Sequence, residues 1–272
     1  MRLVVRLKLC QFILMNKLYH LSDRALLGID GPDTKEFLQS VITNDMALLE
    51  SQPAIYAAHL TPKGKFLYDF FICKLGDMYV IDCNKSELMP LAKSFHGYVI
   101  SKQVNFHDLS DDYQCVASTE VLEGDLSYMD PRTNKLGYRH WLKSLPKTVD
   151  TVDNYHKNRI QLGIIDGAYD GLKERSLINE MGFEALNGVS FEKGCYVGQE
   201  LTARTKFRTE PKKKVFQITF TGKAEIGDAI KCGNMDAGWI FSNTDGQGIA
   251  IIRTRYIGKD MTLNDNPIHI KA

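Results

Sequence analysis

One segment of the sequence combines residue types that are suited to chemistry, and a cysteine lies at its centre. Residues 192–200 read EKGCYVGQE. Two glycines flank Cys195 and allow a tight turn, and the good helix formers from Gln199 onward place this cysteine just before a helix N-terminus. The positive end of that helix and the ammonium of Lys193 would both favour a thiolate. The segment therefore predicts an accessible thiol that acts as a nucleophile, redox sensor or metal ligand, against the alternative of a small apolar residue that fills a turn.

Composition restricts the classes of protein that fit this chain. Its 272 residues are 44% apolar and 25% charged, which is the globular range. The 34 basic and 33 acidic residues nearly balance, so the overall charge favours neither a nucleic-acid nor a membrane partner. The six cysteines form no CxxC pair, and neither they nor the seven histidines show metal-ligand spacing. We therefore predict reduced thiols and no metal site.

The elements that precede the cysteine segment alternate between short strands and helices. Three β-rich runs at 54–60, 66–75 and 78–83 are joined by short turns and predict an antiparallel meander. Residues 104–109 and 113–118 are expected to form another hairpin. Further strands are expected at 19–21, 25–29 and 136–141, and helices at 86–99, at 152–162 and after Gly31-Pro32-Asp33.

The sequence pattern changes near residue 210, where short β runs separated by glycine turns begin. They lie at 215–221, 229–232, 238–243, 248–253 and 268–271, a spacing typical of a small barrel or sandwich. We therefore divide the chain into an N-terminal extension or mis-called start (1–15), two interleaved α+β subdomains (16–209) and a C-terminal β-barrel domain (210–272).

The segment Lys193–Glu200 resembles the signature Lys-Gly-Cys-Tyr-x-Gly-Gln-Glu of the YgfZ family, whose mitochondrial members are iron–sulfur cluster assembly factors. All seven fixed residues are present: Lys193, Gly194, Cys195, Tyr196, Gly198, Gln199 and Glu200. Four other segments, LINEMG at 177–182, LNGVSF at 186–191, Thr43-Asn44-Asp45 and the hairpin 64–69, also resemble this family. The resemblance implies the α+β folate-binding fold of the glycine-cleavage T protein, a tetrahydrofolate-dependent aminomethyltransferase, with antiparallel sheets and a small C-terminal β-barrel.

The same resemblance implies a tetrahydrofolate site. Glu180 would accept the amino group and ring N–H of the pterin, because a carboxylate can make this bidentate contact. Tyr56, thirteen residues before Asp69, would line the pocket, with Gln199 and Arg204 as further cofactor contacts. Without the resemblance, Glu180 would be read as a solvated loop acid, Tyr56 as a strand aromatic and Asp69 as an exposed acid at a strand edge.

Three residues are assigned catalytic roles, again by resemblance: Cys195, Lys193 and Asp69. Asp69 corresponds to the aspartate that assists proton handling at the folate nitrogen in the aminomethyltransferase. That enzyme has an Asp-Asp doublet, whereas this sequence has Tyr68 at the first position. True aminomethyltransferases of the glycine-cleavage system also lack the cysteine signature, so we expect no glycine-cleavage activity here.

The resemblance implies an accessory factor that binds tetrahydrofolate, or a one-carbon derivative, and assists assembly or repair of iron–sulfur proteins. Because clusters usually take four protein ligands, Cys195 would act with a client or carrier protein, a shared cluster or a folate-derived adduct. Two alternatives are an aminomethyltransferase-like one-carbon transferase and a tRNA-modification accessory protein, the latter resting on the basic stretch 204–214 alone. We expect a monomer with no membrane or nucleic-acid partner.

The first fourteen residues are basic and apolar and contain no acidic residue. They lack the small-residue cleavage site of a secretory signal. We read them as an over-called start with Met15 as the initiator, as a short extension, or as a fragment of an organellar targeting peptide. The cytoplasm is the expected compartment, with the mitochondrial matrix as the alternative for a eukaryotic chain.

Overall fold

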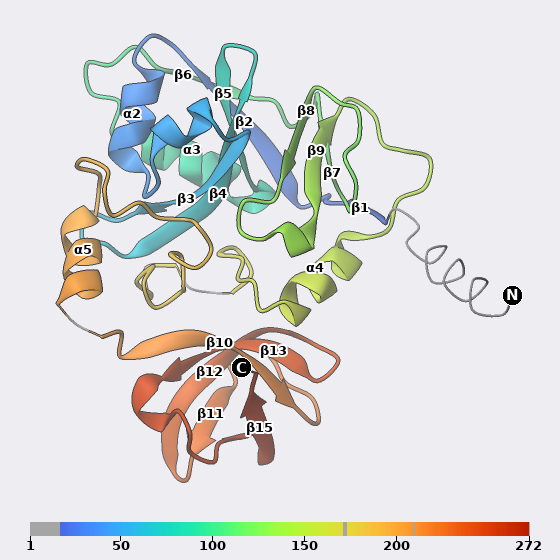
Figure 1. Cartoon of the computed structure of the whole chain (residues 1–272), viewed down its shortest axis with the longest axis vertical. Helices are drawn as coiled ribbons and strands as arrows, with labels where there is room; N and C mark the ends of the chain where they lie inside the picture. The colour runs from blue at the N-terminus through green and yellow to red at the C-terminus, as the bar shows by residue number, and fades with distance from the viewer. Residues whose placement is uncertain (1–16, 171–172, 209, 272) are drawn as a thin grey trace, which may run out of the picture.

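The computed structural model describes residues 17–170, 173–208 and 210–271. The expected N-terminal extension, residues 1–15, lies outside the described residues. The described chain forms two antiparallel sheets that pack on each other, and a closed barrel that lies below them (Figure 1). This architecture confirms the expected α+β class with a C-terminal barrel. Over the described residues, no helix is long and apolar enough to cross a membrane.

A five-stranded sheet forms the centre of the upper part. Its strand order is β3-β4-β5-β2-β6, and all pairs are antiparallel, so the predicted meander is confirmed. Its strands are β2 (Arg24–Asp30), β3 (Ala54–Leu60), β4 (Phe66–Leu75), β5 (Met78–Asn84) and β6 (Asn105–Asp108).

Two helices cover one face of this sheet, α2 (Thr34–Val41) and α3 (Leu88–His96). Phe37, Leu38 and Val41 of α2 are buried at helical spacing, because residues three or four apart share one side of a helix. The helices pack on alternate strand residues such as Ile55 and Phe70, while the neighbouring Tyr56 and Phe71 point to the opposite face. Both faces of the sheet are therefore buried.

The second sheet covers that opposite face and has the order β1-β7-β9-β8. Its strands are β1 (Leu18–His20), β7 (Gln114–Ser118), β8 (Leu126–Met129) and β9 (Tyr138–Leu142). The hairpin expected from residues 104–109 and 113–118 is wrong: β6 pairs with β2, whereas β7 pairs with β1 and β9. Both runs are extended, but each finds its hydrogen-bond partners in a different sheet.

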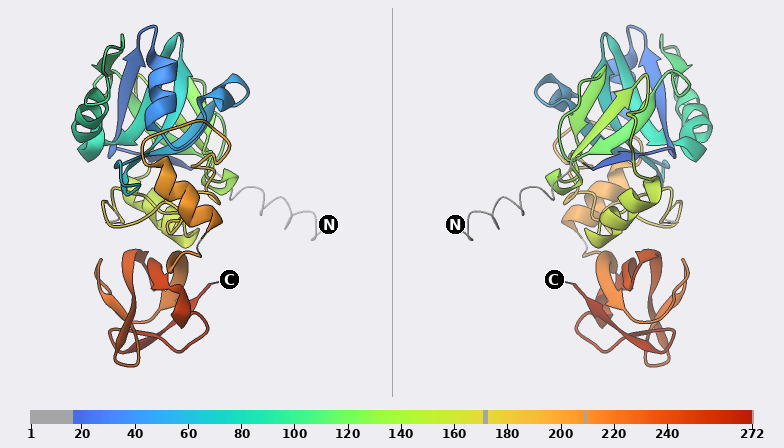
Figure 2. Two further views of the ribbon diagram at one scale, coloured as in Figure 1. Left: turned by 90° about the vertical axis from the view of Figure 1, so that its left-hand side faces the viewer. Right: turned by 90° about the vertical axis from the view of Figure 1, so that its right-hand side faces the viewer.

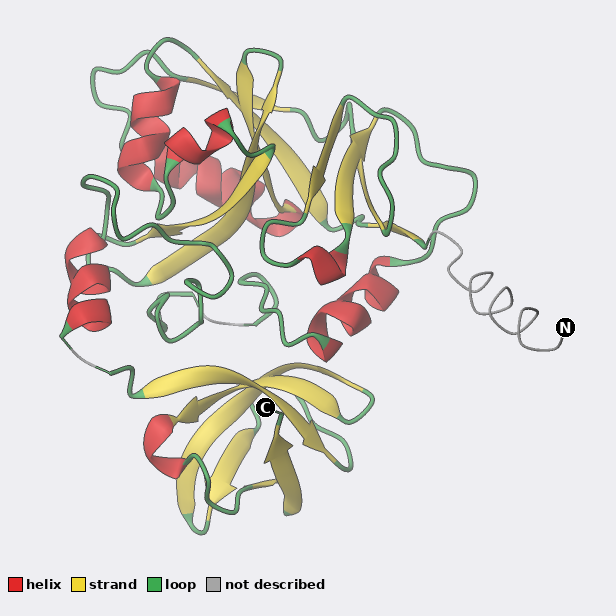
Figure 3. Cartoon of the chain, viewed as in Figure 1, coloured by secondary structure: helices red, strands yellow, loops and turns green. Residues whose placement is uncertain are grey.

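The C-terminal barrel closes in the order β10-β13-β12-β11-β14-β15. Helix α4 (Val152–Gln161) lies between the barrel and the sheets, and α5 (Gln199–Phe207) leads toward β10 (Figures 1 and 2). The barrel strands are β10 (Lys213–Phe220), β11 (Ala229–Cys232), β12 (Met235–Thr244), β13 (Gln247–Arg253), β14 (Thr262–Leu263) and β15 (Asn266–Ile270). Short 3-10 helices occur at η1 (Met46–Glu50), η2 (Lys85–Glu87), η3 (Asn134–Leu136) and η4 (Thr254–Tyr256) (Figure 3).

A network of ion pairs is buried where the two sheets meet. The carboxylate of Asp82 accepts hydrogen bonds from Arg139 at 2.8 and 3.1 Å and from Arg24 at 2.7 Å. The Tyr128 hydroxyl donates to the same carboxylate at 2.6 Å. Burial by itself would raise the pKa of Asp82, but the charges of Arg139 and Arg24 outweigh it and hold this pKa below its usual range. Asp82 therefore joins both sheets as a carboxylate.

Asp82→Asn should lower the free energy of unfolding by about 3–5 kcal/mol, because it leaves two buried guanidinium groups without their counter-ion. Because the folded-state pKa of Asp82 is lowered, its stabilising contribution is present above the pKa of the unfolded state and is lost as the pH falls through the folded value. The free energy of unfolding, measured with urea at several pH values, should fall less steeply toward acid pH in the variant than in the unmodified protein. Asp111→Asn, at an exposed position, is the matched control. Equal stability of the two variants would contradict this account.

Candidate functional site

The loop that carries Cys195 is attached to the protein by the residue at its start. The ammonium of Lys193 is buried and donates to three backbone carbonyls, those of Gln39 at 2.7 Å, Ile42 at 2.9 Å and Asn44 at 2.8 Å. These carbonyls lie at and after the C-terminal end of α2, where backbone oxygens lack helical partners. Burial lowers the pKa of Lys193 to about 7, against the opposing charge of Asp45.

This contact corrects the expectation that the Lys193 ammonium acts on Cys195. An ammonium has three N–H donors, and all three are used by the carbonyls of residues 39, 42 and 44. No N–H of Lys193 is left to donate to the sulfur. Lys193 therefore positions the loop, and its charge is directed at the end of α2.

The remaining residues of the signature hold the turn together. The amide oxygen of Gln199 accepts from the backbone N–H of Tyr196 at 3.2 Å, and its amide nitrogen donates to the carbonyl of Lys193 at 3.3 Å. Tyr196 is buried in the core, and the N–H of Val197 donates to the backbone carbonyl of Ser40 at 3.0 Å. Gln199, which we predicted to contact a cofactor, instead spans the cysteine turn.

Gly198 allows the close contact between this loop and the hairpin that joins β3 to β4. It adopts φ +82°, and a Cβ atom there would lie 2.8 Å from the carbonyl oxygen of Thr61 and 3.0 Å from the Cα of Gly64. Gly64 in turn has φ +68° and approaches the carbonyl of Gly198. Side chains are excluded at both positions, because the backbones meet directly. The helix α5 then begins at Gln199, as expected.

The outcome is a cysteine that faces outward from a loop anchored on both sides. Cys195 and Gly194 are exposed, whereas the flanking Lys193 and Tyr196 are buried. Three other cysteines, Cys73, Cys83 and Cys115, are buried, and burial raises the pKa of each thiol. Cys232 is partly buried in β11, so Cys195 is the most exposed of the cysteines that the structure describes.

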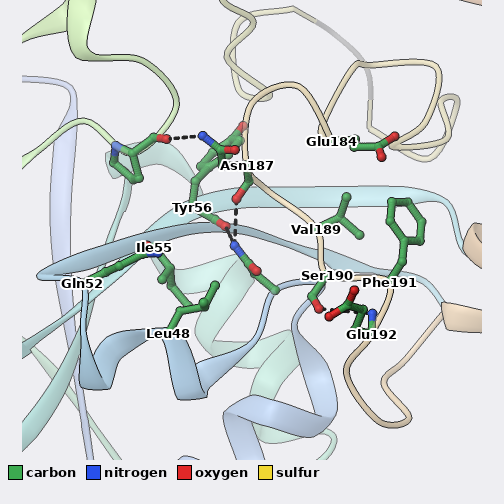
Figure 4. A pocket seen from close by; sticks show the side chains of 12 residues that line it. Leu48, Gln52, Ile55, Tyr56, Glu184, Asn187, Val189, Ser190, Phe191 and Glu192 are labelled. Carbon is green, nitrogen blue, oxygen red and sulfur yellow. Dashed lines mark hydrogen bonds between the residues drawn. The ribbon is translucent and has the colours of Figure 1, made fainter.

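A cavity of about 530 Å³ lies beside this loop (Figure 4). Tyr56 of β3 and Leu48 of η1 line one part of it, and the segment that leads to the cysteine loop lines the other through Val189 and Phe191. Its size is in the usual range for small-molecule sites, and its lining mixes apolar and polar groups. The full lining is Asn44, Leu48, Gln52, Ile55, Tyr56, Pro131, Glu184, Asn187, Val189, Ser190, Phe191 and Glu192.

The Thr43-Asn44-Asp45 segment ties the cavity wall together. The amide nitrogen of Asn44 donates to the carbonyls of Tyr56 at 2.7 Å and Asn187 at 2.8 Å. The hydroxyl of Thr43 donates to the carbonyl of Gly188 at 2.7 Å and accepts from the N–H of Ala58. These contacts join β3 to the irregular segment, which is the part of the chain between α4 and α5. Sequence reasoning did not assign the cavity residues on that segment, although the Asn187-Gly188 pair is a turn signal.

Tyr56 and Asp69 lie together but face the protein interior. The hydroxyl of Tyr56 donates to the Asp69 carboxylate at 2.7 Å, and the N–H of Gly167 donates to its other oxygen at 3.1 Å. Burial raises the pKa of Asp69, and the nearby carboxylate of Asp166 adds to the effect. Asp69 is therefore a buried acid and not an exposed acid at a strand edge.

Glu180 lies elsewhere and lines a different cavity. Its carboxylate accepts from the N–H of Leu177 at 3.1 Å and lies 3.4 Å from the ammonium of Lys213 at the start of the barrel. Arg204 and Glu200 lie exposed on α5. Of the residues predicted to hold a pterin, Tyr56 and Asp69 lie together, and Tyr56 lines the 530 Å³ cavity, whereas Glu180 lines the cavity beside the barrel.

Lys193→Met should lower the free energy of unfolding by about 1.5–3 kcal/mol, because three carbonyls lose a charged donor. We expect faster hydrogen exchange at the N–H of Val197, which the anchored loop protects. Thermal unfolding and exchange measured by mass spectrometry check this. Lys63→Met, at an exposed lysine of the β3–β4 turn, provides the control. Unchanged protection of residue 197 in the Lys193 variant would show that the anchor does not hold the loop.

Several known proteins are similar to this chain. A family model described as the CAF17 C-terminal beta-barrel domain matches residues 212–272. The mitochondrial iron-sulfur cluster assembly factor IBA57 homolog of Mycosarcoma maydis is 31% identical over 231 residues, which cover 75% of this chain but 57% of that protein. Mitochondrial IBA57 of Mus musculus is 29% identical, and the matched region covers 93% of this chain and 80% of that protein. The tRNA-modifying protein YgfZ of Photobacterium profundum is 26% identical, and the matched region covers 86% of this chain and 82% of that protein.

The fold has a counterpart among solved structures. The aminomethyltransferase T of the glycine cleavage system from Bartonella henselae superposes with a TM-score of 0.78 at 14% identity, over 94% of this chain and 85% of that protein. This likeness confirms the T-protein fold that the sequence signature implied. The chain is thus a homologue of the IBA57 and YgfZ proteins, with a C-terminal barrel of the CAF17 type and the fold of the glycine-cleavage T protein.

Proposed function

We propose that this protein is an accessory factor of iron–sulfur cluster assembly, in which Cys195 supplies one thiolate to a cluster that a client or carrier protein also holds. The relatives named as iron-sulfur cluster assembly factors support the cluster chemistry. The observation that carries the role of Cys195 is its exposure on an anchored loop while Cys73, Cys83 and Cys115 are buried.

The geometry suits ligand sharing between two proteins. A single thiolate supplies one of the four protein ligands that a cluster usually takes, so the remaining ligands come from the partner. The thiol of Cys195 loses its proton as the iron–sulfur bond forms. Lys193 and Gln199 restrict the movement of the loop, so little conformational entropy is lost when the partner binds.

Cys195→Ser should abolish the ability of this protein to restore iron–sulfur enzyme activity in a strain that lacks its own IBA57 homologue. Serine keeps the size of the side chain but is a poor ligand for iron in a cluster. Cys232→Ser, in the barrel strand β11, is the matched control and should restore activity fully. Aconitase activity in cell extracts, with the level of each variant measured by immunoblot, is the readout. Full activity with the Cys195 variant would exclude the thiol from the function.

For the compartment we propose the mitochondrial matrix. The relatives from Mycosarcoma maydis and Mus musculus are named as mitochondrial proteins. They support the alternative that the sequence left open for a eukaryotic chain over the cytoplasm.

A second proposal is that tetrahydrofolate binds in the 530 Å³ cavity. The T-protein fold and the similarity to YgfZ support folate use, and the cavity is large enough for a pteridine. Of the set chosen by resemblance, Tyr56 lines this cavity, whereas Glu180 lines the cavity beside the barrel and Asp69 is bonded to Tyr56 and Gly167. We therefore derive no chemical step through folate.

Calorimetric titration with tetrahydrofolate tests this proposal. Val189→Trp should weaken binding at least tenfold, because the indole fills the cavity, whereas Val121→Trp at an exposed position should not change it. Glu180→Gln should also bind normally, because Glu180 does not line this cavity. No heat of binding with the unmodified protein, or loss of binding only in the Glu180 variant, would contradict the assignment.

A further inference from the structure

A second cavity, of about 510 Å³, lies where the barrel meets the irregular segment that contains Glu180. Lys212 and Lys213 enter it from the start of β10, and Arg253 and Arg255 from the end of β13 and from η4. In Figure 3, η4 is the short helix beside the barrel strands. The cavity is distinct from the one beside the cysteine loop, because the two have no lining residue in common.

The strand register brings these four cations together. Lys213 is paired with Arg253 in the antiparallel β10–β13 ladder, and the N–H of Thr254 donates to the carbonyl of Lys212 at 2.9 Å. Directly opposed residues lie on the same face of a sheet, and like charges in such a pair are destabilising. The barrel therefore places positive charges together at a cost to its own stability.

Few groups of the protein neutralise these charges. Lys213 lies 3.4 Å from the carboxylate of Glu180. Arg253 donates to the backbone carbonyl of Asp236 at 2.9 Å and stacks on Trp239, and Arg255 donates to the hydroxyl of Tyr256 at 3.0 Å.

The Lys212 ammonium makes no hydrogen bond or ion pair with any residue in the described part of the chain. One carboxylate thus faces four cations, which leaves the cavity with an excess of three positive charges.

We infer that this cavity binds a small polyanion that carries two or more phosphate or carboxylate groups. Guanidinium groups make forked, paired contacts with such groups, and two of them together with a free ammonium match a ligand with several negative charges. A concave site of this size encloses a small ligand. The lining has no aromatic side chain on which a nucleic-acid base would stack, so a small anion fits better than RNA. This inference is independent of the proposed role of Cys195.

Tripolyphosphate and citrate are the probes, one for each anion class, and calorimetry at low and moderate salt is the measurement. The fluorescence of Trp239, which lies under Arg253, gives a second signal. We expect at least one probe to bind the unmodified protein, with an affinity that falls as the salt concentration rises. The better probe identifies the ligand as a phosphate or a carboxylate compound. No binding of either probe at low salt would overturn the inference.

Variants decide the location of the site. Arg253→Gln combined with Arg255→Gln should weaken binding at least tenfold. Lys212→Gln should weaken it severalfold and removes no hydrogen bond or ion pair, because the Lys212 ammonium makes none within the described chain. Lys223→Gln combined with Lys231→Gln removes the same charge elsewhere on the barrel and should change binding less than twofold.

Equal loss of binding in the Lys223/Lys231 control and the arginine variant would show a general charge effect and overturn the inference. So would a short RNA that binds the same residues more tightly than either probe and is not displaced by them. Thermal unfolding of each variant confirms that it is folded.

Discussion

The Lys193 ammonium and its three carbonyl acceptors form the contact on which the candidate site depends. It joins the cysteine loop to the end of α2, although these segments are about 150 residues apart in the sequence. The contact between Gly64 and Gly198 fixes the other side of the loop against the β3–β4 turn. Between these two attachments Cys195 is exposed to solvent. The signature residues around the cysteine thus act mainly by positioning it.

A second constraint is the buried charge between the two sheets. Asp82 and its arginine partners occupy the interior of the upper part, and Asp69 is likewise enclosed by Tyr56 and Gly167. These two carboxylates are therefore already paired with protein partners. The exposed chemistry of the molecule lies instead on the cysteine loop and in the two cavities that open beside it and at the barrel.

The two cavities explain why residues chosen from one resemblance separate in the structure. Tyr56 lines the cavity bounded by the segment that leads to the cysteine loop, although its hydroxyl is bonded to Asp69, and Glu180 lines the basic cavity at the barrel. The irregular segment between α4 and α5 forms a wall of both. The two cavities differ in chemistry: the lining of one mixes apolar and polar groups, and the lining of the other is strongly cationic.

Local sequence was sufficient for much of the fold. The bounds of β3 and β4 match the predicted runs 54–60 and 66–75, and α2 is the helix predicted after Gly31-Pro32-Asp33. These predictions are correct because a strand or helix with a buried face has apolar residues at a regular spacing along the sequence. The barrel and the exposed cysteine turn were equally visible, from glycine spacing and from a signature whose residues are close in sequence.

What depends on distant partners was decided by the tertiary structure. Residues 104–109 and 113–118 are both extended, but only the assembled sheets determine that they never pair. Likewise, the type and position of Lys193 predicted a charge near Cys195, whereas its flexible stem reaches carbonyls at the end of α2. Glu180 was chosen from a motif, yet its ion-pair partner, Lys213, comes from the barrel. Sequence alone determined which residues carry chemistry and which local shapes they adopt. Their partners were set by packing, because contacts between segments far apart in the chain leave no periodic trace in it.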